Sequence, residues 1–177
     1  MTDLDSELVA RATQLADDHL FPSALEVDAS GTIPSAQLDL VRDAGLYGLF
    51  APGEFGGLGA SPATQWAVHE LLSGGCLTTS FVWAQHAGAS KAAIETTGPM
   101  RQRWAAALAT GESRGGVAFA HLNRPGTPTL RAEPKDGGWE FSGSAPFVTG
   151  WGHIDVVLTA ARHKDSVVWA MLDARDC

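Results

Sequence analysis

The sequence has few cysteines, few basic residues and no long apolar run. Its two cysteines, Cys76 and Cys177, lie far apart without Cys or His neighbours at ligand spacing, which argues against a disulfide framework or a zinc site. Twelve Lys and Arg against 20 Asp and Glu give a net charge of −8 with no basic run. Nucleic acids and anionic membrane surfaces both bind basic patches, so neither is an expected partner.

The distribution of apolar residues also predicts neither a membrane span nor a secretory signal. No apolar run approaches the ~18 residues that a membrane span needs. The acidic beginning "MTDLDSELVA" lacks the apolar segment of a signal peptide. We therefore expect a cytoplasmic protein without a membrane span. Because 45% of the residues are hydrophobic and 18% are charged, the chain can bury a sizeable core.

Residues 1–112 have the texture of a helical domain. Apolar residues recur at helical spacing from Leu4 to Leu20. Proline in a first turn and a capping hydroxyl mark later helix starts, and glycines that accept left-handed backbone mark helix ends. The expected later starts are Pro34, Pro62 after Ser61, Leu77 and Pro99, and the expected stops are Gly45, Gly98 and Gly111. The sequence thus predicts five helices.

Residues 113–177 have a different texture. Short β-rich runs, "GGVAFAHL", "GWEFSG", "HIDVVLTAAR" and "SVVWAMLD", are separated by "NRPGTP", "KDGG" and "RHKD". Periods near two and turn residues indicate antiparallel strands. The expected fold class is therefore α+β and multi-domain, with a helical domain over 1–112 and an antiparallel β-domain over 113–177. Since the last strand-like run almost reaches Cys177, we expect this β-domain to be incomplete.

The glycine-dense stretch "FAPGEFGGLG", Phe50 to Gly59, raises the question of phosphate binding. A dinucleotide fingerprint needs a strand before the glycines, whereas a helix ending at Gly45 precedes them here. No Gly-Lys-Ser of a Walker motif follows. We expect an architectural connector between helices that binds no phosphate, with glycines supplying positive φ.

Few catalytic constellations are present. No Gly-x-Ser-x-Gly elbow supports hydrolysis, and no metal site is expected. The pair Asp17 and Asp18 fits a solvated helix face. His86 lies among apolar helix residues and is expected to be structural, with a place in a ligand pocket as the alternative.

The order of several motifs resembles the acyl-CoA dehydrogenase family. The family's Gly-Leu-x-Gly-Leu and Pro-x-Glu-x-Gly-Gly-x-Gly match residues 45–49 and 52–59. "AQHAGASKAAIETTGPMRQRWAAALATGE" is similar to two of its helices, and "GWEFSGSAPFVTGWGHIDVVLTAAR" is similar to its middle-domain hairpin. The resemblance extends from about residue 30 through nearly the whole chain, and it is the order and spacing of the motifs that make it specific.

The resemblance implies a three-domain flavoprotein. Such proteins have a helical domain, a β-domain and a C-terminal helical bundle, and they bind FAD, usually as tetramers. A glutamate of the C-terminal bundle removes the α-proton of an acyl-CoA while the β-hydride goes to flavin N5. The bundle is absent from this sequence, so no residue here is expected to be catalytic, and we expect the chain alone to be inactive. An acyl-CoA or other thioester, an electron-transfer flavoprotein and further copies of the chain are the implied partners.

The resemblance also assigns flavin contacts in two segments. The first holds Leu122 and Asn123, and the second holds Phe147, Val148 and Thr149. Asn123 would contact the pyrimidine edge, Phe147 would pack on the isoalloxazine ring, and the Thr149 hydroxyl would lie near N5. A hydroxyl at that point can stabilise the negative charge that develops on the flavin.

Two departures from the family pattern bear on the reaction. Asn123 and Arg124 stand where the family has threonine and glutamate, and "GTPTLRAEP" replaces a Gly-Ser-Asp loop. These departures put the use of CoA in doubt and favour a flavin monooxygenase or oxidase on the same fold as the alternative. A third interpretation is a non-catalytic partner subunit.

Overall fold

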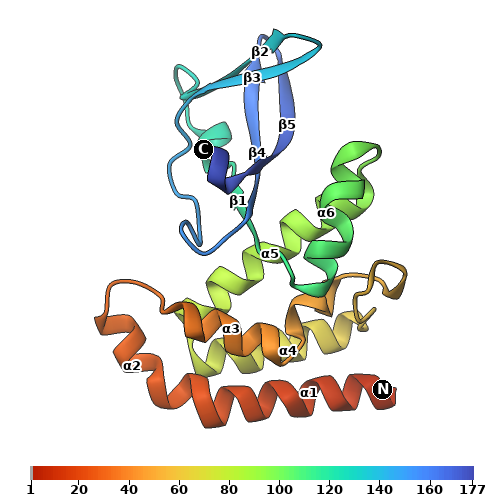
Figure 1. Cartoon of the computed structure of the whole chain (residues 1–177). Coiled ribbons are helices and arrows are strands. Elements are labelled where there is room, and N and C mark those ends of the chain that lie inside the picture. Colours follow the sequence, from red (N-terminus) through yellow and green to blue (C-terminus); the bar gives the residue numbers. More distant parts are fainter. Residues whose placement is uncertain (1) are drawn as a thin grey trace.

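The computed structural model describes residues 2–177, in which a β-sheet stands on a group of helices (Figure 1). The α-helices are α1 Asp3–Leu15, α2 Phe21–Ala29, α3 Ser35–Asp43, α4 Pro62–Gly75, α5 Leu77–Glu95 and α6 Pro99–Thr110. Shorter helical turns are η1 Ala16–Leu20, η2 Leu46–Phe50, η3 Gly53–Phe55, η4 Ala120–Asn123 and η5 Ala174–Asp176. Within residues 2–177 no helix is long and apolar enough to cross a membrane.

Most helix ends follow local rules that the sequence already displays. The Ser61 hydroxyl accepts a hydrogen bond from the Thr64 N–H at the start of α4, and Pro62 occupies the first turn. Gly45 and Gly111 adopt left-handed backbone after α3 and α6. The expected starts and stops are therefore confirmed at these positions.

Asp5 links the first helix to the fourth. Its carboxylate accepts hydrogen bonds from the Thr64 hydroxyl at 2.6 Å and from the Thr2 hydroxyl at 2.9 Å. These hydrogen bonds, led by that from Thr64, hold the pKa of the Asp5 carboxyl well below its ordinary value. The same carboxylate thus caps α1 and fixes it against α4.

The expectation of five helices was wrong by one. The chain passes from α1 through a π-helical turn, η1, directly into α2, which has Pro22 in its first turn and buries Val27. The bulge lies where α4 comes close, because a side chain at Gly75 would be 3.1 Å from the Ala16 Cα. An inserted residue in a helix shifts its face, and the apolar spacing beyond Leu20 no longer registers as one helix.

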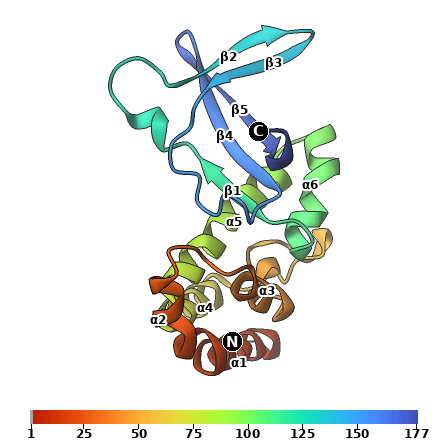
Figure 2. The same cartoon turned by 60° about the vertical axis from the view of Figure 1, so that its left-hand side comes forward.

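The strands are β1 Gly115–Ala118, β2 Leu130–Lys135, β3 Gly138–Gly143, β4 Val156–His163 and β5 Ser166–Asp173. They form one sheet in the order β1-β4-β2-β3, with β5 also paired to β4. β4 is antiparallel to β5, and β2 is antiparallel to β3. Figure 2 shows the β2–β3 hairpin reaching away from the helices.

The order of helices followed by strands is confirmed, but the sheet is mixed rather than antiparallel throughout. β1 and β4 are parallel, with Gly115 opposite Val156, and β2 meets β4 in a parallel bridge between Arg131 and Arg162. The chain between β1 and β4 includes the whole β2–β3 hairpin, so β4 can return in the direction of β1. Local patterns identify strands but not their distant partners.

Two further β expectations need correction. β3 and β4 are not the two arms of one hairpin, because β3 pairs with β2. β2 itself lies in "TLRAEPK", a stretch that we expected to be a loop. Pro134 interrupts the strand signal there, although it is tolerated in the structure opposite Trp139.

Three apolar clusters hold the structure together. The first lies among the helices and includes Leu8, Leu72 and Trp83. The second joins α5 and α6 to the sheet, where Trp104 and Leu108 pack with Val156 and Leu158. A small third cluster of Leu130, Ala132 and Ala161 lies under the β2–β3 hairpin. The second cluster makes the helices and the sheet share one core.

His86 lies at this shared core and is 1% exposed. Its Nε2–H donates to the Leu108 carbonyl at 2.9 Å, and its Nδ1 accepts the Gly115 N–H at 3.0 Å. The two bonds fix a neutral ring, because a protonated ring has no nitrogen left to accept. The structural role expected for this histidine is confirmed by its two main-chain partners.

The glycine-dense loop is shaped by close backbone approaches. The N–H groups of Leu58 and Gly59 donate to the carbonyls of Gly48 and Ala51, both at 2.8 Å. A Cβ on Gly57 would lie 2.2 Å from the Ala51 oxygen. Gly56 has φ of +86°. These close approaches and the positive φ of Gly56 account for the shape of the connector between η2 and α4.

We predict that His86→Ala lowers the free energy of unfolding by roughly 3–5 kcal/mol, because it leaves the Leu108 carbonyl and the Gly115 N–H unpaired and opens a cavity. Urea unfolding followed by circular dichroism measures the loss. His19→Ala is the matched control, since His19 is exposed, and it should change stability by less than about 0.5 kcal/mol. Equal losses in the two variants would contradict the role of His86.

We also predict a pH dependence carried by His86. Burial lowers the pKa of His86 to about 4, against about 6.5 in an unfolded chain. Between these values His86 binds a proton in the unfolded state but not in the folded state. The free energy of unfolding therefore falls as the pH drops and levels off below about pH 4. The loss specific to His86 should be about 3 kcal/mol between pH 7 and pH 4. Unfolding of parent and His86→Gln at both pH values measures it, and parallel pH profiles would refute it.

Gly57→Ala should destabilise the chain by roughly 2 kcal/mol or more, since the added methyl meets the Ala51 carbonyl. Gly53→Ala is the control within the same loop, because nothing lies within 4 Å of a Cβ there and its φ is not positive. Thermal unfolding of both variants is the measurement. A Gly57→Ala protein as stable as Gly53→Ala would show that the loop can open without cost.

Candidate functional site

The first predicted flavin segment lies in the short helical turn η4, which is anchored on β4. The His121 Nε2–H donates to the Ala160 carbonyl at 2.8 Å, and His121 is buried. Arg162 donates to the Leu122 carbonyl at 3.2 Å. Leu122 is half-buried, while the side chain of Asn123 is exposed. The turn therefore holds Leu122 in the fold and presents the Asn123 amide to solvent.

The second predicted segment lies in the loop between β3 and β4. Phe147 is 72% exposed and has φ of +62°. Val148 and Thr149 are half-buried. The Thr149 carbonyl packs against β1, where a Cβ on Gly116 would be 2.9 Å from it. The sequence led us to expect Phe147 in a hairpin strand, and the structure corrects this to an irregular loop that lies close to β1.

The end of this loop is fixed where β4 begins. The Asp155 carboxylate accepts the Arg114 N–H at 2.8 Å, and the Asp155 N–H donates to the Arg114 carbonyl at 2.8 Å. The Arg114 side chain in turn donates to Asp39 of α3 at 2.5 Å. The pKa of the Asp39 carboxyl is lowered, chiefly by its hydrogen bond from Arg114. The loop that carries Phe147 to Thr149 is thus tied to both the sheet and the helices.

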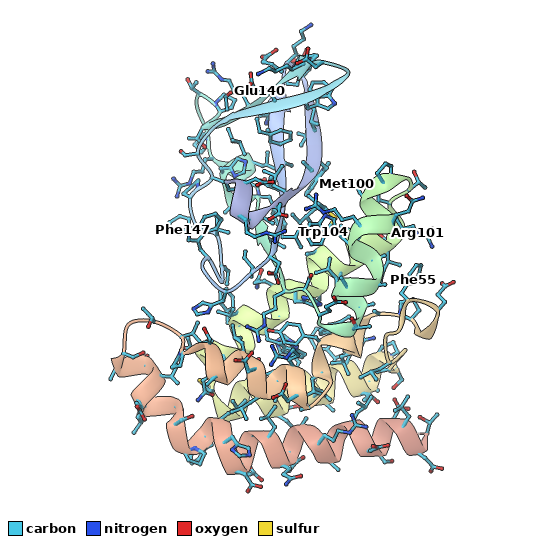
Figure 3. The ribbon with its side chains drawn as sticks, viewed as in Figure 1. Phe55, Met100, Arg101, Trp104, Glu140 and Phe147 are labelled. Atoms are coloured by element: carbon cyan, nitrogen blue, oxygen red, sulfur yellow. The ribbon has the colours of Figure 1, made fainter. Side chains whose placement is uncertain are left out.

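The two predicted segments meet at one pair of side chains. The Arg124 Cζ lies over the Phe147 ring, 5.3 Å from its centroid. Arg124 directly follows Asn123, so the amide and the aromatic ring lie on neighbouring parts of the surface. In Figure 3 Phe147 lies on the opposite side of the sheet from Met100, Arg101 and Trp104 of α6. The exposed Phe147 ring therefore lies away from these residues of α6 (Figure 3).

Val148 differs from its neighbours because it lines a cavity of about 930 Å³. The cavity lies against the sheet and has aromatic walls with a polar end. Its aromatic residues are Trp139, Phe141 and Trp151, and its polar residues include Arg103, Thr159 and Asp173. Leu122, Asn123, Phe147 and Thr149 are not among its lining residues. The structure thus divides the five predicted contacts between this cavity and the surface around Phe147.

Asp173 is the buried charge at the polar end of the cavity. Its carboxylate accepts hydrogen bonds from Arg175 at 2.5 Å and from Arg103 of α6 at 2.6 Å. Hydrogen bonds from Arg175, with its positive charge, lower the pKa of the Asp173 carboxyl. A carboxylate held ionised by two guanidinium groups is a poor proton acceptor. Its arrangement fits a structural link between β5 and α6.

Other acidic residues near the sheet have no catalytic geometry either. Glu133 and Glu140 face each other across β2 and β3. Glu140 pairs with Lys135, and Glu133 lies 3.6 Å from His163. The Asp155 carboxylate is taken up by the Arg114 N–H. Within residues 2–177 no group of three His, Cys, Asp or Glu side chains could hold a metal ion.

Arg124 is the residue that sequence reasoning passed over as a site candidate. It was noted only as a departure from the family's glutamate. The available signal was its charge, because an isolated cation next to Asn123 stands out in a chain with 12 basic and 20 acidic residues. Its contact with Phe147, 23 positions later, has no counterpart in the local pattern.

The fold and sequence resemble known flavin enzymes. A 3-sulfinopropanoyl-CoA desulfinase from Variovorax paradoxus is 27% identical over 166 residues, which are 92% of this chain and 42% of that protein. The structure of butyryl-CoA dehydrogenase from Megasphaera elsdenii matches with a TM-score of 0.84 at 19% identity, over 98% of this chain and 49% of that one. Dibenzothiophene monooxygenase from Paenibacillus sp. A11-2 matches with a TM-score of 0.78 at 22% identity, over 95% and 44%.

The chain spans about two fifths of the length of the curated relatives it matches. The family model described as "Acyl-CoA dehydrogenase, N-terminal domain" matches residues 2–112, which are more than half of the chain. The helical region followed by a mixed sheet agrees with the fold of the matched structures. This protein chain belongs to the acyl-CoA dehydrogenase family.

Proposed function

We propose that this chain supplies part of the flavin site of an FAD-dependent oxidoreductase that dehydrogenates an acyl thioester between its α and β carbons, with hydride transfer to flavin N5. The observation that carries the proposal is the contact between Arg124 and Phe147. It brings the two segments assigned to flavin binding, which are far apart in the sequence, to one exposed surface. Membership of the family supports the reaction class.

The residues at this surface fit a flavin. Asn123 is exposed and can both donate and accept hydrogen bonds, as the pyrimidine edge requires. Phe147 presents a largely exposed ring for stacking. Thr149 carries a hydroxyl two residues later on the same anchored loop. When bound, FAD would supply the hydride acceptor, while these side chains would orient it and stabilise negative charge on its ring.

The proposal gives the chain a binding and orienting role. Within residues 2–177 we assign no proton-abstracting base: Glu140 pairs with Lys135, the Asp155 carboxylate accepts the Arg114 N–H, and Glu133 is an exposed residue of β2. An acyl-CoA substrate is supported by the matched desulfinase from Variovorax paradoxus, whose name contains 3-sulfinopropanoyl-CoA. An electron-transfer flavoprotein as electron acceptor, assembly of several copies and a cytoplasmic location are further parts of the proposal.

A flavin monooxygenase or oxidase is the second candidate. Asn123 and Arg124 replace the threonine and glutamate of the family pattern, and this change at the flavin edge favours a different reaction. The structural match to a monooxygenase supports only the fold at 22% identity. A non-catalytic partner subunit is the alternative if no flavin binds.

Titration of the purified chain with FAD, followed by visible absorption, tests the proposal. Binding should shift the flavin spectrum in the parent, and acyl-CoA should perturb that spectrum further if a thioester is the substrate. Oxygen uptake after flavin reduction, with no effect of acyl-CoA, would favour the monooxygenase or oxidase. No spectral change at millimolar FAD would refute a flavin site in this chain.

Thr149→Val should slow reduction of bound FAD by roughly tenfold or more, because it removes a hydrogen-bond donor from a position that stabilises the reduced ring. Anaerobic stopped-flow absorbance with a chemical reductant measures the rate. Thr97→Val is the control, since Thr97 is exposed between α5 and α6. Equal rates in parent and Thr149→Val would remove Thr149 from the proposed mechanism.

A further inference from the structure

Phe147 is held in a backbone conformation that a phenylalanine disfavours. Its φ of +62° lies in the left-handed region, which is unfavourable for a residue with a Cβ. Burial does not offset this cost, because 72% of the side chain is exposed. Only two other non-glycine residues among 2–177 have positive φ, and both, Asp136 and Lys164, lie in tight turns between paired strands. Phe147 has no such turn to explain it.

Arg124 is the residue that lies on the Phe147 ring, and its charge is uncompensated. Among the ion pairs of residues 2–177, no carboxylate oxygen lies within 4.0 Å of the Arg124 guanidinium. Among residues 2–177, the identified interaction of the Arg124 guanidinium is with the Phe147 ring, whose centroid lies 5.3 Å from the Cζ. A guanidinium that stacks by its face keeps the N–H donors of its edge available. The pair therefore combines a largely exposed aromatic ring with a positively charged guanidinium that has no carboxylate partner among residues 2–177.

A second arginine over a phenylalanine shows how a purely structural pair looks here. The Arg101 Cζ lies 4.8 Å from the centroid of Phe55. Phe55, however, is half-buried and packs against the cluster of Trp104 and Leu108. Its backbone has negative φ, since it is not among the positive-φ residues of 2–177. The two pairs share their contact but differ in the exposure of the ring and in the backbone conformation of the phenylalanine.

We propose that Arg124 is a ligand-binding residue of this site, which recognises a planar ring with a carbonyl-rich or anionic edge that stacks on Phe147. The inference rests on the proposed function, in which that ring is the flavin. Oxidised flavin carries carbonyl oxygens on its pyrimidine ring, and reduced flavin carries a negative charge there at neutral pH. A guanidinium donating to this edge binds the reduced form more tightly than the oxidised form, because charge-assisted hydrogen bonds are the stronger ones.

The test is anaerobic calorimetric titration of the chain with oxidised and with reduced FAD. Arg124→Gln should weaken binding of oxidised FAD about threefold and of reduced FAD at least tenfold. Arg124→Lys should retain part of the preference for the reduced form, since it keeps the charge. Phe147→Leu should weaken both forms by a similar factor, because stacking does not depend on the flavin's charge. Arg101→Gln is the matched control and should bind both forms like the parent.

The outcomes separate this inference from the proposed function. If the parent binds FAD and Arg124→Gln binds both forms equally well, the role of Arg124 is wrong and the flavin site stands. If Arg101→Gln loses the same preference, the effect comes from net charge, which also refutes the inference. If the parent binds neither form, the flavin function fails for this chain and the inference fails with it. Thermal unfolding of each variant establishes that the folds compared are the same.

Discussion

The neutral His86 ring links α5, α6 and β1 by hydrogen bonds, beside the apolar cluster that the helices share with the sheet. One nitrogen binds the end of α6 through the Leu108 carbonyl, and the other binds the first residue of β1 through the Gly115 N–H. The ring itself comes from the middle of α5 and meets Tyr47 edge-on, with 4.7 Å between ring centroids. Because both main-chain groups are buried, neither can turn to water if the ring is lost. The place where helices give way to strands is therefore defined by one side chain.

The position of the sheet follows from this point. Once Gly115 is fixed, β1 runs parallel to β4, and Arg114 and Asp155 exchange hydrogen bonds at the adjoining ends of the two strands. α5 and α6 then share an apolar cluster with β4, to which Val156 and Leu158 contribute. The candidate site depends on the same strands. His121 of η4 donates a hydrogen bond to Ala160 of β4, and the Phe147 loop packs against Gly116 of β1 through the Thr149 carbonyl.

Much of the helical region could be predicted from the sequence because its signals are local. Ser61 with Pro62, and Gly111 after α6, act on neighbouring backbone groups, and each appears where expected. The π-helical turn before Phe21 was missed because no local signal marks it, and the residue that packs closely on it, Gly75, lies more than 50 positions away. The parallel pairing of β1 with β4 was missed for the same reason. It depends on how the chain returns after the β2–β3 hairpin.

The candidate site likewise has residues that the sequence suggested and one contact that only the fold reveals. Asn123 and Thr149 were predicted as flavin contacts by resemblance to a motif order, and the structure places them in a short helical turn and in a loop against β1. Arg124 was not identified, since its meaning comes from Phe147, which lies beyond the β2–β3 hairpin. A single sequence reveals residue types, whereas the stacking of a cation on a ring appears only when the loops are folded.

Gly116 has a consequence for how tightly any ligand can be held. With no side chain there, the Thr149 carbonyl approaches strand β1 so closely that a Cβ would lie 2.9 Å away. The loop that bears Phe147 is thereby packed directly against the parallel pair of β1 and β4. A ligand that stacks on Phe147 meets a backbone that is already ordered, so little conformational entropy is lost on binding and more of the contact energy appears as affinity.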